Sequence, residues 1–465
     1  MKFGGTSVED APAFARVAEI VDAYKPARPV VVVSAMSGVT DALLASVRMA
    51  TDGEMDAAMH NLAEHFARHL RIARGLGERA HTEIETLIES ARREISETLK
   101  ALPLRQSTGP RLQDTVLSFG EYLSACLLTA LLRERGMQAC YVDARLCIIT
   151  NDDAGCASPL LNETERQTRA TLAPILDAGN IPVLGGFIGA TRQGITTTLG
   201  RGGSDYTASL VGAALRSREI QIWTDVNGVM TADPRVVKAA QTVARLSYAE
   251  ASELAYFGAK VLHPKTIQPA IKLGIPVRIC NSRTPDAFGT LVCAEPESER
   301  RTVKAIAHKT GVTTVKVTSA RFLGAYGFLR RIFEIFDRHR TVVDVVTTSE
   351  VSLSMSLDDV RALPGIVEEL KQIGSVEVST NRAVVCIVGE GLCGAPRITA
   401  SVFNSIRNIP ITLISQGASS SNLTFVVDEE CVKTVVTRLH RTFFENGIEE
   451  FQEMVPLELM SIAGS

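Results

Sequence analysis

The sequence predicts an α/β fold: a three-layer αβα domain with a mainly parallel central sheet, followed by two small α+β modules. Three observations lead to this prediction. Short apolar runs alternate with helix-like sequence in the first part of the chain, glycine-rich turns follow several of them, and the last third contains a weak internal repeat. Alternating strands and helices are typical of a parallel sheet covered on both faces. A chain of 465 residues, 45% of them hydrophobic, is long enough for about three domains.

The first run that resembles a buried parallel strand is the valine-rich segment 29–34. Continuous β-branched runs are typical of strands that are buried on both faces. Apolar runs at 139–143, 181–184 and 219–223 predict further strands of the same sheet. The segment 51–104 is charged and alanine-rich with apolar residues at helical spacing, which predicts a helical insertion.

The most informative stretch begins one residue into the chain, with Lys2-Phe3-Gly4-Gly5-Thr6-Ser7. Two adjacent glycines let backbone N–H groups approach an anion closely, and the lysine supplies a positive charge. The stretch therefore predicts a loop that binds phosphate. Because a single glycine pair is most often an ordinary turn, the prediction depends on the clusters that accompany it.

A second glycine-rich turn at 200–207 opens into a helix-like stretch and offers a second anion site. Arg201 in this turn can bind a carboxylate through two parallel hydrogen bonds. Asp205 can hold an ammonium group or orient metal-bound water. Together these side chains fit an amino-acid substrate.

Other polar side chains flank predicted strands and helices. Ser34 and Thr40 border a turn after the strand at 29–34, and Glu121 precedes an apolar helical run. Open α/β sheets bind their ligands at the carboxyl ends of the strands. We therefore expect these side chains to lie near the two glycine-rich loops.

Two clusters suit a nucleoside and its phosphates. The segment 223–229 ends an apolar strand with polar groups and leads to Arg235, while 257–264 places Lys260 just after a glycine. In isolation each has an ordinary structural explanation, as a helix cap or a solvated side chain. The Walker and Rossmann glycine patterns are both absent from the sequence, which disfavours the two commonest nucleotide folds.

His65 and His69 have the i,i+4 spacing that places two imidazoles on one face of a helix. A zinc site of this kind needs a third ligand, which is not evident, and the H-E-x-x-H order is missing. We expect an ordinary solvated helix face here and no metal site.

Composition excludes several functional classes. A formal net charge of -3 gives no basis for binding nucleic acid or an anionic membrane. The nine cysteines form no C-x-x-C pair, so neither a zinc cluster nor a redox dithiol is indicated. Neither an apolar run of about 20 residues nor a leader of the secretory type is evident. We expect a cytoplasmic protein without a membrane or nucleic-acid partner.

The last third of the chain contains a weak repeat. A polar, proline-broken stretch at 294–301 suits a linker. Beyond it, the segment 327–358, with a predicted strand at 342–346, is echoed by 395–428 about 70 residues later. Two copies of this pattern predict a pair of small α+β modules, an arrangement that often senses ligands.

Taken together, the motifs resemble those of the aspartate kinases, members of the amino-acid kinase superfamily. The matching segments are KFGGTSV at 2–8, TTTLGRGGSDYTA at 196–208, WTDVNGV at 223–229, TADPR at 231–235 and FGAKVLHP at 257–264. They occur in the family's order and approximate spacing. The similarity extends over essentially the whole chain.

The resemblance implies an amino-acid kinase domain followed by two ferredoxin-like ACT modules, one inserted within the other. The implied layout is a catalytic domain at 1–293, a linker at 294–302, a first ACT module at 310–380, and a second ACT module formed by 303–309 together with 381–450. In this family the lysine of the first loop ends a buried strand of several apolar residues. Because only Met1 precedes Lys2 here, we expect Lys2 on a frayed end. Either the natural start lies upstream or neighbouring contacts alone hold the lysine.

The resemblance also implies the reaction, in which ATP with Mg²⁺ phosphorylates the side-chain carboxylate of L-aspartate to 4-phospho-L-aspartate, the first step toward lysine, threonine and methionine. The implied catalytic residues are Lys2 and Asp205. The implied aspartate pocket consists of Ser34, Thr40, Glu121, Phe187, Arg201, Ser204 and Asp205. The implied ATP site consists of Lys2, Gly4, Gly5, Ser7, Thr224, Asp225, Met230, Arg235 and Lys260, where Met230 replaces a tyrosine of several relatives.

Within the family, the segment 342–354 most resembles the monofunctional, lysine-sensitive branch. The implied effector site consists of Phe322, Gly327, Phe328, Leu329, Val343, Asp344, Thr348, Ser349 and Glu350. Asp344 suits the ammonium group of lysine, although a surface carboxylate at a strand start is an ordinary alternative. Threonine remains open as the effector.

Three other interpretations remain open. One is another kinase of the superfamily, acting on glutamate, acetylglutamate or uridylate, which the regulatory repeat disfavours. A second is a catalytically silent amino-acid sensor, which the presence of Lys2, Arg201 and Asp205 disfavours. A third is a part of a bifunctional protein joined to another enzyme. The family's ACT modules pair across subunits, which implies a homodimer or a larger oligomer.

Overall fold

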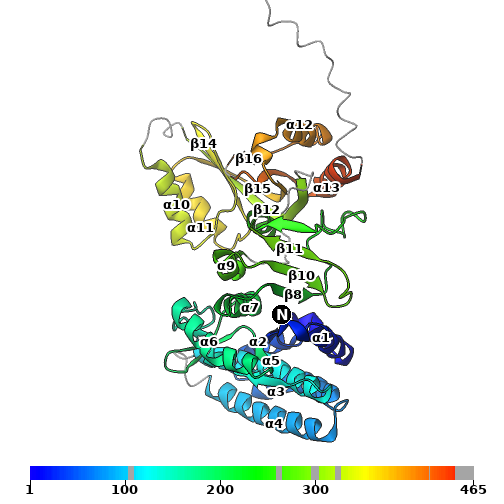
Figure 1. Cartoon of the computed structure of the whole chain (residues 1–465). Helices are drawn as coiled ribbons and strands as arrows, with labels where there is room; N and C mark the ends of the chain where they lie inside the picture. Colours follow the sequence, from blue (N-terminus) through cyan, green and yellow to red (C-terminus); the bar gives the residue numbers. More distant parts are fainter. Residues whose placement is uncertain (103–108, 258–263, 295–302, 320–325, 418, 446–465) are drawn as a thin grey trace, which may run out of the picture. The chain divides into compact units, whose positions relative to one another are not determined.

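The computed structural model describes residues 1–102, 109–257, 264–294, 303–319, 326–417 and 419–445. The chain divides into two compact units. The first unit comprises Met1–Val229, Ala244–Tyr248 and Val261–Pro296, and the second comprises Met230–Val243, Ala249–Lys260 and Glu297–Ser465. Figure 1 shows the chain coloured along its sequence. The boundary between the units is crossed several times by the chain, so each unit is built from separate segments.

The first unit is organised around an eight-stranded sheet with the order β3-β5-β2-β1-β8-β10-β11-β9. Its strands are β1 (Lys2–Phe3), β2 (Val31–Val33), β3 (Ala139–Val142), β5 (Ile181–Gly185), β8 (Ile220–Thr224), β9 (Arg245–Ser247), β10 (Val277–Asn281) and β11 (Thr290–Cys293). Neighbouring strands are parallel except for the antiparallel pair β10–β11. The predicted mainly parallel sheet is confirmed, and all four predicted apolar runs form strands.

Helices cover both faces of this sheet. They are α1 (Ala11–Ala23), α2 (Val39–Thr51), α3 (Met55–Ala73), α4 (Glu78–Ala101), α5 (Gly109–Glu134), α6 (Leu161–Asp177), α7 (Gly203–Ala214) and α9 (Pro264–Lys272). Helix α8 (Tyr248–Tyr256) groups with the second unit, apart from Tyr248. One hydrophobic core joins α1 to α5 with the sheet, and another joins α6 and α7 to its opposite face. Among the described residues, helix α5 matches a membrane span in length and composition, although no apolar run of that length was expected from the sequence. Of its most apolar window, 83% is buried inside the structure.

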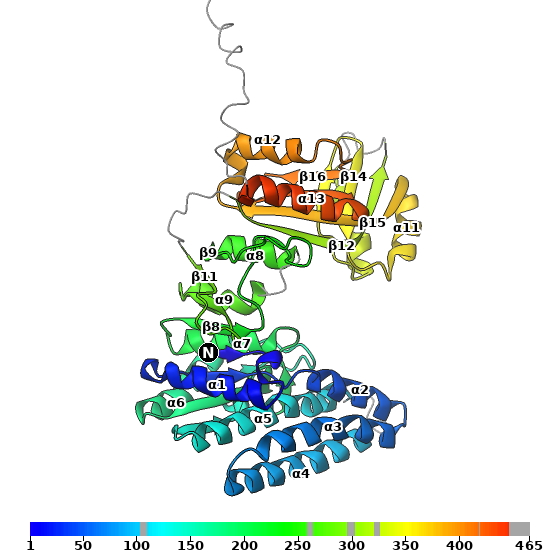
Figure 2. The same ribbon diagram turned by 90° about the vertical axis from the view of Figure 1, so that its right-hand side faces the viewer.

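The segment 51–104 contains the long antiparallel helices α3 and α4, which lie against α5 (Figure 2). The expectation of a solvated face at His65 and His69 is wrong for His69, whose side chain is buried. His69 lies on the same face of α3 as Leu62 and Phe66, which pack into the core. Burial lowers the pKa of His69 to about 4, so its ring is neutral at physiological pH.

Strand β1 has only two residues, but it lies in the middle of the sheet. Lys2 and Phe3 pair in parallel with Val32 and Val33 on one side and with Ile222 and Trp223 on the other. The Phe3 ring is fully buried and stacks on Trp223, with 6.0 Å between ring centroids. The expectation of a frayed end at Lys2 is therefore wrong, because β-sheet pairing and ring packing with neighbouring strands fix this strand.

The second unit contains a six-stranded antiparallel sheet with the order β13-β14-β12-β15-β17-β16. Its strands are β12 (Val303–Thr318), β13 (Val346–Thr348), β14 (Ser352–Leu357), β15 (Ser375–Gly389), β16 (Leu413–Gln416) and β17 (Asn422–Asp428). Helices α10 (Phe328–Arg338) and α11 (Leu363–Lys371) pack on one half of the sheet, and α12 (Pro396–Ser405) and α13 (Val432–His440) pack on the other (Figure 1).

The predicted repeat is present, but its two copies share their central strands. The first half of β12 pairs with the second half of β15, and the second half of β12 pairs with the first half of β15 and with β14. The register shifts between Lys309 and Val312, where the two halves meet. The predicted strand at 342–346 is wrong: the strand begins at Val346, and Val342 is exposed. Apolar composition alone did not reveal that only the last residue of this segment belongs to the edge strand of the sheet.

A buried carboxylate fastens α5 to a small sheet formed by β4 (Ile149–Thr150), β6 (Ile188–Thr191) and β7 (Thr196–Thr198). Asp114 accepts hydrogen bonds from the backbone N–H of Gly155 at 2.9 Å and from the Thr198 hydroxyl at 2.7 Å. Burial raises the pKa of Asp114, and these hydrogen bonds oppose that shift. The carboxylate therefore satisfies backbone and hydroxyl groups that no other described side chain reaches.

We expect Asp114→Ala to destabilise the first unit by about 1–3 kcal/mol, because it leaves buried donors without acceptors. The measurement is the unfolding midpoint in urea followed by Trp223 fluorescence, which reports on the first unit. The matched control is Asp152→Ala, which removes an exposed carboxylate paired with Arg111 and should change stability by less than about 1 kcal/mol. Equal midpoints for the two variants would contradict the structural role of Asp114.

Candidate functional site

The first glycine-rich loop follows β1 directly and is closed by its neighbours. The Gly4 N–H donates to the carbonyl of Trp223 at 3.0 Å, and a 3₁₀ turn (Gly5–Val8) begins at the next residue. A Cβ on Gly5 would lie 2.9 Å from the backbone oxygen of Ala35, so a larger residue would displace the loop. Glycine is required here because the backbone of the following loop approaches so closely.

Lys2 is held beside the second glycine-rich loop. Its Nζ lies 2.7 Å from Oδ1 of Asp205, and the two side chains are only 11% and 17% exposed. Asp205 lies in the first turn of α7, and Gly202 caps this helix with a left-handed φ of 73°. The helix predicted to follow the turn at 200–207 is present, but it begins earlier, at Gly203 within that turn. The structure thus brings the two predicted catalytic residues into direct contact.

Glu121 lies beside this ion pair in the middle of α5. Its side chain is buried, and Oε2 has no hydrogen-bond partner among the described residues. Burial raises the pKa of Glu121 to about 8, and the nearby charge of Lys2 is among the weaker influences that oppose this shift. A buried oxygen without a donor in a site that contains a lysine suits a ligand that brings a cationic or hydrogen-bonding group.

The junction between β5 and α7 is tightly packed around Phe187 and Ser204. Phe187 has a left-handed φ of 65°, which is uncommon for an aromatic residue and is often found at functional sites. A Cβ on Gly186 would lie 2.6 Å from the Cβ of Ser204, and a Cβ on Gly203 would lie 2.7 Å from the Phe187 ring. These two glycines let the ring and the hydroxyl of the predicted pocket lie side by side.

Arg201 differs from its neighbours because its side chain is exposed. Within the part of the chain that the structure describes, it forms no ion pair. An exposed arginine without an ion-pair partner can still bind a carboxylate with two hydrogen bonds. The structure therefore places Arg201 in the predicted loop but leaves its guanidinium without a partner of the described chain.

The loop after β2 carries Ser34 and leads to Thr40 in the first turn of α2. The Ser34 N–H donates to the carbonyl of Phe3 at 3.0 Å. The Ser37 N–H donates to the carbonyl of Gly5 at 3.2 Å, and the Ser37 carbonyl accepts from Arg68 of α3 at 2.6 Å. Through Arg68, the helical insertion supports the loop after β2, which in turn contacts the first glycine-rich loop. The sequence did not indicate this role for Arg68.

Ser282 is another residue that sequence reasoning missed. Its hydroxyl lies 2.8 Å from the hydroxyl of Ser7, and its N–H donates to the carbonyl of Thr224 at 2.8 Å. It therefore joins the first glycine loop to the end of β8, where Thr224 donates to the exposed carboxylate of Asp225. The only available signal was its place directly after the apolar run that forms β10.

Two further predicted nucleotide residues, Met230 and Arg235, group with the second unit. Arg235 is held by Asp233 through three side-chain hydrogen bonds, with Nη2 2.7 Å from Oδ2, and its side chain is 88% exposed. The arginine lowers the pKa of Asp233, chiefly through this hydrogen bonding. Met230 is half-buried nearby, and Lys260 lies outside the described residues. The sequence motif at 231–235 therefore presents a preformed, outward-facing guanidinium.

The predicted effector residues are gathered around the start of α10 and the edge of the sheet in the second unit. Gly327 caps α10 with a φ of 75°, Phe328 is buried, and Phe322 lies outside the described residues. Val343 packs on the core beneath, whereas Leu329, Thr348, Ser349 and Glu350 are exposed. Asp344 accepts a hydrogen bond from the Tyr256 hydroxyl, and its Oδ2 lies 3.7 Å from Nζ of Lys309.

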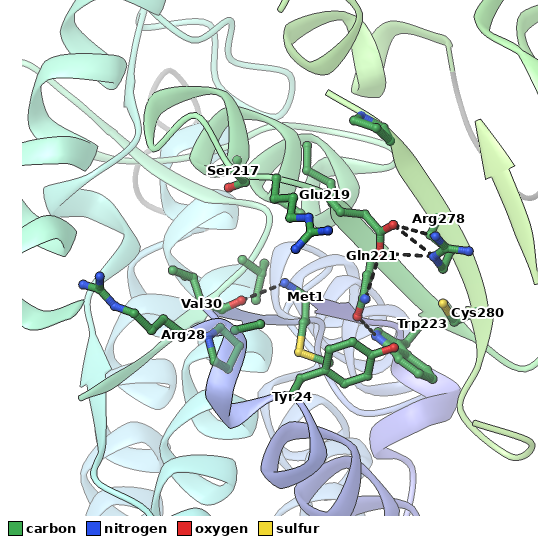
Figure 3. A pocket seen from close by; sticks show the side chains of 18 of the residues that line it. Met1, Tyr24, Arg28, Val30, Ser217, Glu219, Gln221, Trp223, Arg278 and Cys280 are labelled. Atoms are coloured by element: carbon green, nitrogen blue, oxygen red, sulfur yellow. Dashed lines mark hydrogen bonds and ion pairs between the residues drawn. The ribbon is translucent and has the colours of Figure 1, made fainter. Parts of the chain in front are cut away.

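A cavity of about 980 Å³ lies at the opposite, amino end of the strands, and none of the predicted site residues lines it. Figure 3 shows its polar groups paired with one another, with Glu219 bonded to Arg278 and Gln221 to Trp223. The ammonium of Met1 donates to the carbonyl of Val30 at 2.8 Å, and burial lowers its pKa to about 5. The candidate site is therefore not this cavity but the cluster around Lys2.

Comparison with known proteins places this arrangement in a family. The model of the amino acid kinase family matches residues 1–281, and an ACT domain model matches residues 385–443. The chain is 39% identical over 456 residues to the lysine-sensitive aspartokinase 3 of Escherichia coli, covering 96% of this chain and 98% of that protein. It is 38% identical over 463 residues to the chloroplastic aspartokinase 2 of Arabidopsis thaliana, covering 96% and 84%.

Solved structures agree with this result. Aspartokinase III of E. coli in complex with lysine and aspartate matches with a TM-score of 0.80 and 39% identity, covering 96% of this chain and 99% of that one. The same enzyme in complex with aspartate and ADP also matches with a TM-score of 0.80. The fold, the tandem regulatory modules and these near full-length matches lead to one conclusion. The chain belongs to the amino acid kinase family and, within it, to the aspartokinases.

Proposed function

We propose that the cluster around Lys2 is the place where this aspartokinase transfers a phosphoryl group from ATP to the side-chain carboxylate of L-aspartate. One observation carries the proposal: Lys2 forms a 2.7 Å ion pair with Asp205 directly behind the first glycine loop, and the unsatisfied carboxyl of Glu121 is buried beside it. The lysine and backbone N–H groups suit the phosphates, whereas the carboxyl groups suit an amino acid. One end of the cluster therefore suits the phosphate anions of ATP, and the other end suits the ammonium group of the amino acid.

At the anion end, Lys2, Gly4, Gly5 and Ser7 would contact the phosphates. An ionised carboxylate is already a nucleophile, so the reaction needs no strong general base. Alignment and neutralisation of the charge on the transferring group are the main requirements. Lys2 meets the second requirement because Asp205 and the sheet hold its ammonium in one position. Asp205 thereby orients the lysine.

At the amino-acid end, Glu121 would accept the α-ammonium group of aspartate and Arg201 would bind the α-carboxylate. Glu121 has an open oxygen, and Arg201 has a guanidinium without a partner in the described chain. The rest of the aspartate pocket would be formed by the small and polar side chains around them, namely Ser34, Thr40, Phe187, Ser204 and Asp205.

ATP would be held by Thr224 and Asp225 at the end of β8 and by Met230, Arg235 and Lys260 in the segments that follow. Magnesium would fit this site when it is bound together with the nucleotide. The described residues contain no group of three or more His, Cys, Asp or Glu placed to hold a metal ion, and Mg²⁺ is often bound by one or two carboxylates together with substrate phosphates. When bound, it would neutralise charge on the transferred phosphate, and Asp205 is the carboxylate best placed to assist.

Lysine would regulate the enzyme through the site around Asp344. The carboxylate of Asp344 already has a hydroxyl donor in Tyr256 and a cation in Lys309, which is shared with Asp358. A lysine effector would bring a second ammonium group to this carboxylate, so it would share or replace these partners. The other effector contacts would come from Phe322, Gly327, Phe328, Leu329, Val343, Thr348, Ser349 and Glu350.

The regulatory region would consist of one ACT module at 310–380 and a second formed by 303–309 and 381–450, after a catalytic domain at 1–293 and a linker at 294–302. The pairing of the first half of β12 with the half of β15 next to β17 supports this interleaved division. A homodimer formed through these modules and a cytoplasmic location also remain predictions.

Lys2→Met should lower kcat by about 10²- to 10³-fold, because it removes the cation aimed at the developing charge. The assay is ATP-dependent formation of aspartyl hydroxamate in hydroxylamine, which traps the acyl phosphate product. Lys25→Met, a change at an exposed lysine, serves as the control and should keep full activity. Equal activity of the two variants would remove Lys2 from the mechanism.

The KM for aspartate should fall as the pH rises from about 7 to about 9, because the carboxylate form of Glu121 increases above its pKa and only that form attracts the α-ammonium. The relevant pKa is about 8 in the ligand-free protein. Glu121→Gln should show a higher KM with little dependence on pH in this range. In Glu85→Gln, which changes an exposed glutamate of α4, the pH dependence should persist, and its loss in both variants would refute the assignment.

Asp344→Ala should raise the lysine concentration for half-inhibition by about tenfold or more, since a charge-assisted bond to the effector is lost. Uninhibited hydroxamate formation should stay close to that of the unmodified enzyme. Asp359→Ala changes an aspartate paired with Arg361 in the same unit and should leave lysine inhibition intact. Inhibition by threonine instead of lysine would show that the effector assignment is wrong.

A further inference from the structure

A buried histidine near the end of α13 contacts the loop that carries Arg235. His440 is fully buried, and its Nε2 lies 3.0 Å from the hydroxyl of Thr231. On the other side of the ring, Nδ1 lies 2.8 Å from Oε1 of Glu445. Thr231 and His440 are 209 positions apart in the sequence. No motif of the sequence pointed to this pairing.

The donors and acceptors of this cluster form one directed chain. A glutamate carboxylate only accepts hydrogen bonds, so Nδ1 of His440 donates to Glu445, and this tautomer leaves Nε2 available to accept from the Thr231 hydroxyl. The Thr231 oxygen in turn accepts the backbone N–H of Gln241 at 3.0 Å. Hydrogen bonds linked in this way polarise one another in a buried setting. The chain therefore fixes both the ring and the threonine.

The loop at 230–243 belongs to the second unit and packs around this series of hydrogen bonds. The carbonyl of Thr231 accepts the N–H of Ile306 in β12 at 2.8 Å, and Met230 and Thr242 form an antiparallel bridge. Ala232 and Val237 belong to the same hydrophobic core as α13. The loop is consequently held from both sides by residues of the second unit.

A short π-helix (Arg441–Glu445) directly follows α13 and brings Glu445 back to His440. Turns of this kind are rare and are frequently found at functional sites. The ring of His440 also lies against Phe444, with 4.9 Å between centroids. The π-helix thus shapes a pocket that accepts one orientation of the imidazole.

We propose that His440 is a positioning residue for the nucleotide: through Thr231 it sets the loop whose Asp233 fixes the guanidinium of Arg235. Only Ala232 lies between Thr231 and Asp233, and Asp233 holds Arg235 through three side-chain hydrogen bonds. The inference rests on the proposed role of this loop in ATP binding and goes beyond it. It assigns to α13, in the second unit, a structural part in nucleotide affinity.

The test compares the KM values for ATP and for aspartate in the full chain, measured by hydroxamate formation. His440→Leu should raise the KM for ATP by about tenfold, because the buried Thr231 hydroxyl loses its acceptor and the loop shifts. The KM for aspartate should stay within about twofold. Thr231→Val, which keeps the side-chain shape, should produce the same split. His440→Gln, whose amide oxygen can accept from Thr231, should recover most of the affinity for ATP.

Two further variants separate the possible outcomes. Val435→Ala truncates a buried side chain of α13 outside the chain of hydrogen bonds, so it should lower the thermal midpoint and leave both KM values unchanged.

Arg235→Ala tests the loop itself and should raise the KM for ATP. If it does so while folded His440→Leu and Thr231→Val do not, the positioning role is overturned. Parallel rises of both KM values in the His440 variants would also overturn it. An unchanged KM for ATP in Arg235→Ala would refute the role of the loop and, with it, the inference.

Discussion

The site of this aspartokinase depends on the pairing of a two-residue strand. Lys2 and Phe3 are hydrogen-bonded on both sides, to β2 and β8, and the loops that follow all three strands meet at one edge of the sheet. A parallel sheet brings distant segments together at its carboxyl edge. The ion pair between Lys2 and Asp205, the Ser7–Ser282 contact and the loop at Ser34 all follow from this arrangement. Displacing β1 would separate them simultaneously.

Close backbone packing around this edge decides which residues it tolerates. Gly5, Gly186 and Gly203 each lie where a Cβ would meet a neighbouring atom within 3 Å. The same crowding buries Glu121 and leaves one of its oxygens without a donor, which costs free energy in the absence of a ligand. Natural proteins commonly retain such local cost at functional sites. In this enzyme, close packing at the carboxyl edge of the sheet accounts both for the lack of room for a Cβ at the glycines and for the unpaired oxygen of Glu121.

Sequence patterns predicted the parallel sheet, the helical stretch at 51–104 and the residues that gather around Lys2. Those features depend on local composition and on motifs with a physical purpose. The pattern failed where tertiary packing decides: His69 is buried although its helix is rich in charge, and the strand expected at 342–346 begins at its last residue. Ser282, Arg68 and His440 escaped notice because their partners are remote in sequence. The residues at 258–263, with Lys260, lie outside the described chain.

The continuity of β12 and β15 has a mechanical consequence for the regulatory region. Each strand contributes one half of its length to each repeat, and a single hydrogen-bonded ladder crosses from one repeat to the other with only a shift in register. A sheet of this kind resists shear between its ends, because slippage would break the ladder and turn side chains to the opposite face. The two repeats therefore cannot tilt independently of each other, as two domains joined by a flexible linker could. Strain imposed near α10 is carried by covalent backbone toward the helices at the opposite end.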